Sequence, residues 1–327
     1  MLQTSLMRRV SGGLLALFFF LVSASAAPSS RDTIPGYHRV ELTRGPQNHL
    51  LMPATINGRS ATFLVDTAID LSLLRAEGGK NFGLRSLPQQ VRTAGQFLPA
   101  GETELSAGGA NLGRETFALY QASQLGGPIP GLKGSRADGI IGLNFLRRYK
   151  AVINCRSRHL FLKTDPARRM DASNAMKAGF ARVPLEEDRR GYLTVPCKIR
   201  GRSGRLLLDT GAFLTSIDDG AARALGVTAS PSKITARGLD GKVRPVDLAQ
   251  VDDLQLGGVP IAPQKFVVID VFGRRTPLRT FTGMGRLEYF VPRKIAPGDT
   301  IFGLLGNELL DQRRAIIDFE EMALYLK

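Results

Sequence analysis

The chain has 327 residues, of which 43% are hydrophobic and 22% charged, and this balance is that of a folded protein rather than a disordered one. Two cysteines and three histidines without metal-ligand spacing argue against a zinc site, and we expect no metal and no cofactor. The formal net charge of +15 comes without a recognised nucleic-acid-binding motif, so we expect solvated basic surface and no nucleic-acid partner.

The first residues are typical of a secretory signal peptide. Two arginines precede an apolar stretch at 14–22, and small residues at 24–26 offer a cleavage site. The apolar stretch is short for a membrane span, and an uncleaved anchor is the alternative. We therefore expect export to the periplasm or out of the cell, removal of residues 1–26, a linker at 27–36 and no stable membrane span afterwards.

From about residue 37 the chain consists of two similar halves. Asp66 and Thr67 follow a short apolar run, and Asp209 and Thr210 follow an equivalent run 143 residues later. Both runs are too short for a helix and indicate buried strands that deliver a carboxylate into a turn. Residues of the first half that recur at the same spacing, without a gap, also include Arg39, Val40, Leu50, Pro53, Ile56, Gly58, Arg59, Ser60 and Leu64.

The spacing between equivalent residues grows toward the end of each half. The glycine pair at 108–109 recurs 149 residues later at 257–258. Two apolar residues and a glycine at 140–142 recur 164 residues later at 304–306. An ordered series of this kind indicates a duplication with insertions in the second half, rather than one chance motif.

Both halves consist of short strand-like segments with glycine-rich turns, which is typical of an all-β fold with minor helix. Helical periodicity is confined to short stretches near 220–225 and directly after Gly142 and Gly306. A polar segment at 164–179 separates the halves and is the predicted inter-lobe linker. We therefore expect one lobe at 37–163 and a second at 180–327.

These landmarks resemble the pepsin/retropepsin-like aspartic proteases. The segment 137–143 (ADGIIGL) is similar to the pepsin form of the last landmark, and 209–212 (DTGA) is similar to the retroviral form of the first. The resemblance covers nearly all of the chain from about Tyr37 onward. It implies two tandem retropepsin-like acid-protease lobes with the catalytic dyad at their interface, in a chain that needs no dimer and is expected to be a monomer.

By this resemblance the protein is an aspartic endopeptidase, and Asp66 and Asp209 are its catalytic dyad. Two such carboxylates within reach of each other share a proton. One would activate a water that attacks a carbonyl of a peptide or protein substrate, while the other would hydrogen-bond the carbonyl oxygen. Thr67 and Thr210 would lock the two loops together across the interface.

The backbone N–H groups of Ala68 and Gly211 would hold the two carboxylates. Ala68 is the main departure from the family pattern, because its methyl group stands where a glycine leaves room. This departure supports the alternative hypothesis, a catalytically inactive binding or scaffold protein that keeps the protease fold.

Three further groups of residues complete the predicted site. Substrate contacts are expected from Asp70 and Ala212; Asp70, whose repeat partner is Phe213, has the capping of the following turn as its alternative role. A flap hairpin in the second half is expected to have its tip at Gly238, Leu239, Asp240 and Gly241, with a looser counterpart at 94–97. Packing beneath the dyad loops is expected from Ile140, Ile141, Gly142, Leu304, Leu305 and Gly306.

Two features stay open. Cys155 and Cys197 fall in predicted strands and are expected to be small core side chains, although a disulfide between them is the alternative. The segment 271–297 carries six basic residues against one glutamate and is expected to form a loop or hairpin that contacts anionic surfaces or steers substrate. A protein that interacts through this loop alone is a third hypothesis.

Overall fold

The computed structural model describes residues 33–45, 48–93, 96–121, 137–168, 177–237, 243–271 and 300–327. The predicted signal peptide, the flap tip from Gly238 to Gly241 and the basic segment beyond residue 271 lie outside these residues. Within the described ranges, no helix is long and apolar enough to cross a membrane.

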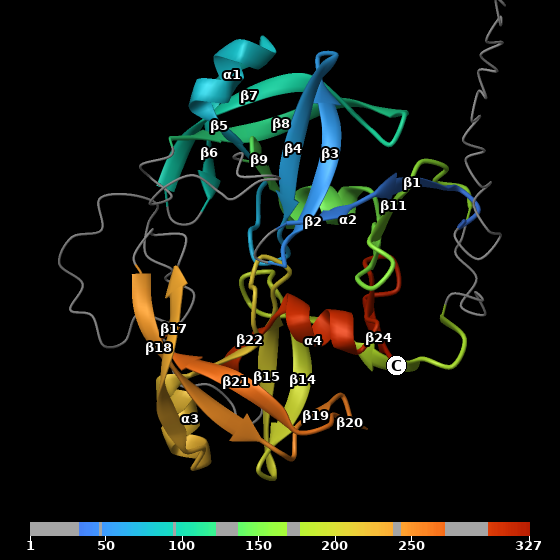
Figure 1. The fold of residues 1–327 in the computed structure, drawn as a ribbon. Helices are drawn as coiled ribbons and strands as arrows, with labels where there is room; N and C mark the ends of the chain where they lie inside the picture. The colour runs from blue at the N-terminus through green and yellow to red at the C-terminus, as the bar shows by residue number, and fades with distance from the viewer. Residues whose placement is uncertain are drawn as a thin grey trace, which may run out of the picture.

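Two β-rich lobes lie on either side of a central sheet, with the first lobe at the top and the second at the bottom of Figure 1. The elements of the first lobe are β1 (Tyr37–Glu41), β2 (Thr43–Arg44), β3 (Leu50–Ile56), β4 (Arg59–Val65), β5 (Leu73–Arg75), α1 (Ala76–Phe82), β6 (Arg85–Thr93), β7 (Gln96–Ala107), β8 (Ala110–Tyr120), β9 (Gly139–Ile141), α2 (Leu143–Arg148), β10 (Val152–Asn154) and β11 (His159–Lys163).

The elements of the second lobe are β12 (Ala181–Pro184), β13 (Glu186–Glu187), β14 (Leu193–Ile199), β15 (Arg202–Leu208), β16 (Ser216–Asp218), α3 (Asp219–Leu225), β17 (Ala229–Arg237), β18 (Val243–Val251), β19 (Gln255–Leu256), β20 (Val259–Pro260), β21 (Gln264–Ile269), β22 (Ile301–Leu305), α4 (Asn307–Gln312), β23 (Ile316–Asp318) and β24 (Ala323–Leu326). The prediction of an all-β fold with minor helix is confirmed.

The duplication is visible element by element. Strands β3, β4 and β5 and helix α1 of the first lobe have β14, β15, β16 and α3 as counterparts 143 residues later. Helix α1 was not predicted, because its sequence AEGGKNF contains two glycines and shows no helical periodicity. Its bounds nevertheless coincide with those of α3 shifted by the repeat spacing, so the repeat itself carried the missing signal.

A six-stranded sheet joins the lobes in the order β1-β11-β10-β23-β24-β12. Its two halves mirror each other, and β10 pairs with β23 in antiparallel register, with Ile153 opposite Ile317. These two residues are themselves repeat equivalents, 164 positions apart. The sheet therefore places a pseudo-twofold axis between the lobes and fixes how they face each other.

In each lobe the strand that ends at the dyad loop lies parallel to a strand from the last landmark. β4 pairs with β9, and β15 pairs with β22. Gly139 and Gly303 lie where these strands also meet β5 and β16, and a Cβ added to them would lie 2.2 Å and 1.9 Å from backbone oxygens. Only glycine allows the backbones to approach this closely, so these positions fix the strand that supports each dyad loop.

The turn between β23 and β24 provides a polar connection between the lobes. Glu320 in this turn accepts hydrogen bonds from Tyr37 at 2.5 Å, from Lys150 at 3.3 Å and from Lys163. Burial alone would raise the pKa of Glu320, but the hydrogen bonds to the carboxylate outweigh it and lower the pKa to about 2. The ionised carboxylate therefore stabilises the docked lobes.

We expect Glu320→Gln to lower the free energy of unfolding by about 2 kcal/mol at pH 7, because it leaves Lys163 without its charged partner. The pKa of Glu320 is lower in the folded than in the unfolded protein, so its contribution is complete above about pH 4.5 and is lost as the pH falls toward 2. Denaturant unfolding across this range measures the effect. Glu186→Gln, in a more exposed pair with Arg205, is the control and should cost less than about 1 kcal/mol. A loss for Glu320→Gln that does not change with pH would contradict this assignment.

Candidate active site

The two predicted dyad carboxylates stand at equivalent places at the lobe interface. The N–H of Asp66, directly after β4, donates to the Ile141 carbonyl at 3.0 Å. The N–H of Asp209, directly after β15, donates to the Leu305 carbonyl at the same distance. Ile141 and Leu305, which were expected to pack beneath the dyad, thus each accept a hydrogen bond from the backbone of one of the two aspartates.

Reciprocal hydrogen bonds join the two dyad loops. Thr67 Oγ1 accepts from the N–H of Thr210 at 3.0 Å and donates to the Leu208 carbonyl at 2.8 Å. Thr210 Oγ1 accepts from the N–H of Thr67 at 3.1 Å and donates to the Val65 carbonyl at 2.8 Å. Both threonines are fully buried, so these four bonds form without competition from water.

The loop backbone orients each carboxylate. Asp66 Oδ1 accepts from the N–H of Ala68 at 2.8 Å. Asp209 Oδ1 accepts from Gly211 at 2.8 Å and from Ala212 at 2.9 Å. A Cβ on Gly211 would lie 2.3 Å from Asp66 Oδ2, so the glycine lets the two loops approach until the Asp66 carboxylate contacts the second loop.

The two carboxyl groups are buried and electrically coupled. Their residues are only 4% and 9% exposed. Burial raises the pKa of Asp66 to about 6, although the Ala68 bond opposes the shift. Burial also raises the pKa of Asp209 well above its ordinary value, and the neighbouring Asp66 charge adds to this. The pair therefore retains a shared proton at mildly acidic pH.

A family model for aspartyl proteases matches the chain twice, over residues 52–145 and 195–309, and each match contains one of the dyad carboxylates. The two matches together exceed half of the chain. The chain belongs to the aspartyl protease family. The resemblance drawn from the ordered landmarks is thereby confirmed, as are the two tandem retropepsin-like lobes. A comparison with curated protein sequences gives no match.

In this member of the family, the residues at the start of helices α2 and α4 form hydrogen bonds with the segment that follows each dyad loop. Ser72 donates from its hydroxyl to Asn144 at 2.9 Å and accepts from the N–H of Gly142 at 3.1 Å. In the second lobe the hydroxyl of Thr215 accepts from Gly306 at 3.0 Å, while the N–H of Thr215 donates to the Glu308 carboxylate at 2.7 Å. The backbone N–H groups of the two landmark glycines thus link the helix starts to the residues that follow each dyad loop.

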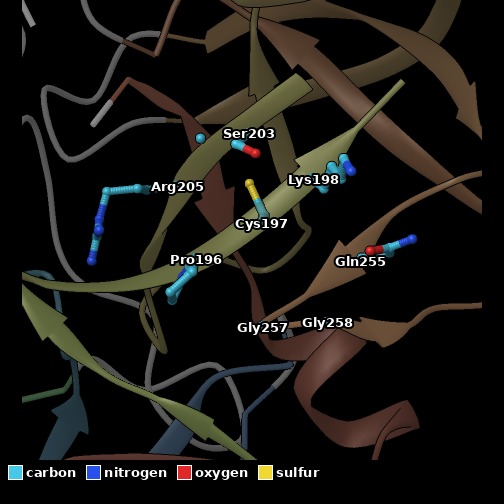
Figure 2. Close-up of a pocket in the computed structure, with 9 residues that line it drawn as sticks. Pro196, Cys197, Lys198, Ser203, Arg205, Gln255, Gly257 and Gly258 are labelled. Carbon is cyan, nitrogen blue, oxygen red and sulfur yellow. The ribbon is translucent and has the colours of Figure 1, made fainter. Parts of the chain in front are cut away.

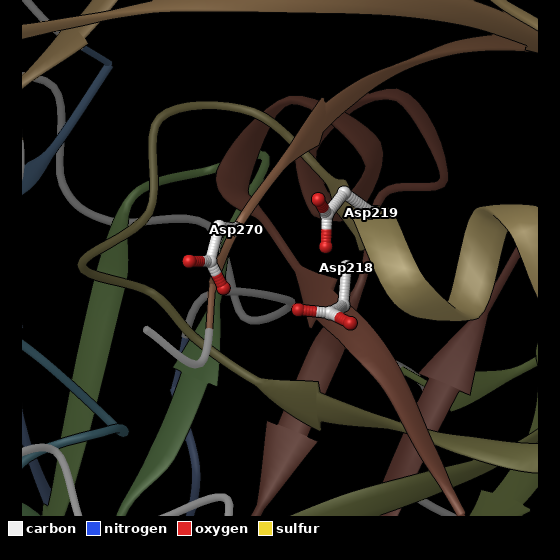
Figure 3. A group of neighbouring side chains, drawn as sticks. All are labelled: Asp218, Asp219 and Asp270. Atoms are coloured by element: carbon white, nitrogen blue, oxygen red, sulfur yellow. The ribbon is translucent and has the colours of Figure 1, made fainter. Parts of the chain in front are cut away.

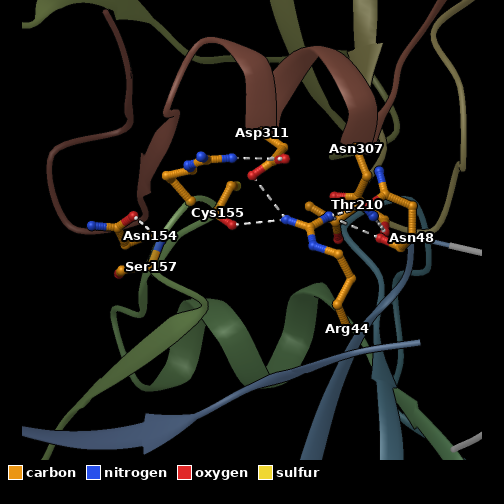
Figure 4. A network of polar contacts seen from close by, with 9 residues as sticks. Arg44, Asn48, Asn154, Cys155, Ser157, Thr210, Asn307 and Asp311 are labelled. Atoms are coloured by element: carbon orange, nitrogen blue, oxygen red, sulfur yellow. Dashed lines mark hydrogen bonds and ion pairs between the residues drawn. The ribbon is translucent and has the colours of Figure 1, made fainter. Parts of the chain in front are cut away.

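One polar residue that sequence reasoning missed braces the second dyad loop. The side-chain amide of Asn307, at the start of α4, donates to the Thr210 carbonyl. His49, from the first lobe, is buried, and burial lowers its pKa. Figure 4 shows how Arg44 connects this region across the interface, through Asn48, the Cys155 carbonyl at 3.0 Å and Asp311 of α4 at 3.1 Å.

The two predicted substrate contacts each follow a dyad aspartate by three or four residues. Asp70 and Ala212 are half-buried in the turns after the dyad motifs, and Asp70 Oδ1 accepts from the adjacent Leu71 N–H at 2.9 Å, as in the capping alternative. Both expected hairpins exist, as β6–β7 and β17–β18. Residues 94–95 of the first predicted tip and all of the second lie outside the described residues, while Phe97 is 66% exposed.

Two other features lie apart from the dyad. Figure 2 shows a pocket on the second lobe between β14, β15 and β19, with Cys197 among its lining residues. Cys155 and Cys197 are both free and buried. Figure 3 shows Asp218, Asp219 and Asp270 together; Asp218 caps α3, and Asp219 pairs with Arg223 at 3.2 Å, so structural partners account for these two carboxylates.

We expect Asp209→Asn to raise the free energy of unfolding by about 2 kcal/mol at pH 8 and by little at pH 4. The pKa values of the dyad are higher in the folded than in the unfolded protein, so ionisation of the buried pair destabilises the fold as the pH rises through them. Chemical denaturation at several pH values measures the difference, with the exposed Asp253→Asn as control. A stabilisation that is equal at both pH values would contradict a burial-driven shift.

Proposed function

We propose that this protein is an aspartic endopeptidase that hydrolyses peptide bonds with Asp66 and Asp209. The observation that carries the proposal is the pair of reciprocally locked loops, which presents two buried, coupled carboxylates on equivalent backbone frames. Burying two such groups side by side is costly for stability and serves no packing purpose. A shared proton between them is what hydrolysis by a water requires.

The mechanism follows from the mixed protonation of the pair. The ionised carboxylate takes a proton from a water, and the resulting hydroxide attacks the substrate carbonyl carbon. The protonated carboxyl donates its hydrogen bond to the carbonyl oxygen, where negative charge develops. Collapse of the tetrahedral intermediate returns a proton to the leaving amine and breaks the C–N bond. The backbone N–H groups that hold both carboxylates keep them oriented throughout.

Exposed apolar side chains support an extended peptide as substrate. Burial of such side chains against a bound peptide would be favourable. Phe97 lies near the tip of the β6–β7 hairpin, Ile234 and Val243 lie on the β17–β18 hairpin, and Phe213 directly follows the second dyad loop. Export of the mature chain, to the periplasm or out of the cell, and action as a monomer complete the proposal, since one chain supplies both carboxylates.

We expect Asp66→Asn and Asp209→Asn each to lower kcat/KM on a mixed peptide library by about a thousandfold, because each removes one partner of the acid–base pair. The native activity should fall as the pH rises beyond about 6, since the shared proton is then lost. Cleavage is followed by mass spectrometry, with folding of each variant checked by circular dichroism. Cleavage that survives both substitutions would overturn the dyad assignment.

The alternative is a catalytically inactive binding or scaffold protein of the same family, and Ala68 is the observation that favours it. The structure keeps the Ala68 N–H on Asp66, so the function of the missing glycine as a donor is retained. No cleavage at any pH by the folded native protein, together with saturable binding of peptides, would favour this alternative.

We expect Gly211→Ala to lower kcat by about a hundredfold, because its Cβ would displace the Asp66 carboxylate from its place in the pair. Gly79→Ala on α1 is the matched control, since a Cβ there meets no atom within 4 Å and alanine is a better helix former. Steady-state kinetics on one cleaved peptide compare the two. Equal activity of Gly211→Ala and Gly79→Ala would contradict the close approach.

A further inference from the structure

Asn307, the first residue of α4, holds the second dyad loop at two carbonyls, one on each side of Gly211. Its side-chain Nδ2 donates to the Thr210 carbonyl, and its backbone N–H donates to the Ala212 carbonyl at 3.0 Å. Figure 4 places Asn307 at the start of α4, next to Thr210. Asn307 is only 1% exposed, so both hydrogen bonds form without competition from water.

The peptide unit between Thr210 and Gly211 links this contact to the dyad. A peptide unit is planar, so its carbonyl oxygen and its N–H group turn together. The Gly211 N–H of this unit donates to Asp209 Oδ1 at 2.8 Å. The Asn307 amide, the peptide unit and the Asp209 carboxylate thus form one chain of hydrogen bonds. A carbonyl that accepts a hydrogen bond also makes the N–H of its own peptide unit a stronger donor.

An amide side chain is a destabilising choice for this position. Its Oδ1 is buried and has no hydrogen-bond partner among the described residues, and an unpaired buried oxygen destabilises a fold. The repeat equivalent is Leu143, which is equally buried at the start of α2. Its N–H donates to the Ile69 carbonyl at 2.8 Å, as that of Asn307 does to Ala212, so both lobes share the backbone contact. Only the bond to Thr210 requires the amide.

Helix α4 provides a fixed backbone for this side chain. Within the second lobe, the Gly306 N–H donates to Thr215 Oγ1 at 3.0 Å. Across the interface, Asp311 of α4 pairs with Arg44 of the first lobe at 3.1 Å. A shift of the Asn307 amide away from the dyad loop would therefore require α4 to break contacts with both lobes.

We propose that Asn307 is a positioning residue for Asp209, whose side-chain amide fixes the Thr210–Gly211 peptide unit and thereby the carboxylate that this unit binds. The inference rests on the proposed function, because its importance for hydrolysis lies in the alignment of the dyad. The contact acts on one carboxylate of the pair, since the leucine at the equivalent position of the first lobe carries no donor.

Asn307→Leu removes the amide and introduces the residue that the first lobe has at this position. We expect kcat to fall about tenfold with KM little changed, because the substitution disturbs the alignment of Asp209. Thr194→Val is the matched control, since Thr194 is also buried in the second lobe and its hydroxyl donates to the Glu186 carbonyl at 2.9 Å. Both substitutions remove a buried donor to a backbone carbonyl, but only Asn307→Leu should change kcat.

A second readout does not depend on cleavage. NMR titration of ¹³C-labelled Asp carboxyl groups reports the apparent pKa values of the dyad, and Asp209→Asn assigns the Asp209 signal. A hydrogen bond to a carboxylate favours its ionised form, so a weaker Gly211 donor should raise these pKa values. We expect the upward shift in Asn307→Leu and no shift in Thr194→Val.

The two readouts separate the inference from the proposed function. An upward shift in Asn307→Leu without any proteolysis by the native protein would support the positioning role while refuting the function. An unchanged dyad titration in folded Asn307→Leu would overturn the inference, and so would a kcat equal to that of Thr194→Val; proteolysis by the native protein would leave the function standing in both cases.

A second variant covers the case in which Asn307→Leu does not fold. In Asn307→Asp an ionised carboxylate cannot donate to the Thr210 carbonyl, whereas a protonated carboxyl can. The loss of kcat relative to the native protein should therefore be smaller at about pH 4 than at about pH 6.5. A loss that is equal at both pH values would overturn the inference.

Discussion

The reciprocal exchange of hydrogen bonds between Thr67 and Thr210 is the constraint on which the rest of the structure depends. Each hydroxyl both accepts from and donates to the opposite loop, so neither loop can shift along the interface without leaving buried polar groups unpaired. The six-stranded sheet that joins the lobes has the same pseudo-twofold axis, because Ile153 pairs with its own repeat equivalent Ile317. Strand pairing at one place and side-chain bonding at another therefore impose a single arrangement of the lobes, and the two carboxylates meet as a consequence.

Sequence reasoning succeeded where backbone chemistry leaves few choices. A carboxylate after an apolar strand and a hydroxyl residue beside it are each required by the local geometry, and their recurrence at one spacing predicted that Asp66 and Asp209 form a pair. The glycines of the last landmark, Gly142 and Gly306, belong to the same class, because a Cβ at either would lie within 2.8 Å of backbone atoms. Such positions can be predicted from the amino-acid sequence, because only one kind of residue can occupy them.

The brace residue Asn307 could not be found in the same way. Its side chain donates to the Thr210 carbonyl of the second dyad loop, and many residue types can occupy such a position. Its repeat equivalent is Leu143, so the internal comparison gives no signal either. The contact joins residues 97 positions apart, so it exists only once the second lobe has folded. The unpredicted helix α1 is a different case, since the repeat spacing from α3 already contained it.

A duplicated chain can make two equivalent loops unequal, which a symmetric pair of identical subunits cannot do while it stays symmetric. The backbone frames here match, but Asp209 accepts from two N–H groups where Asp66 accepts from that of Ala68, and the braces behind the loops differ as well. Hydrogen bonds to a carboxylate favour its ionised form, whereas a neighbouring negative charge favours protonation. At Asp209 both effects act, and burial together with the Asp66 charge prevails, since its pKa is raised in spite of the two donors. Burial of both carboxylates thus keeps the shared proton on the pair, and the N–H donors of each loop lower the pKa of the carboxyl group that they contact.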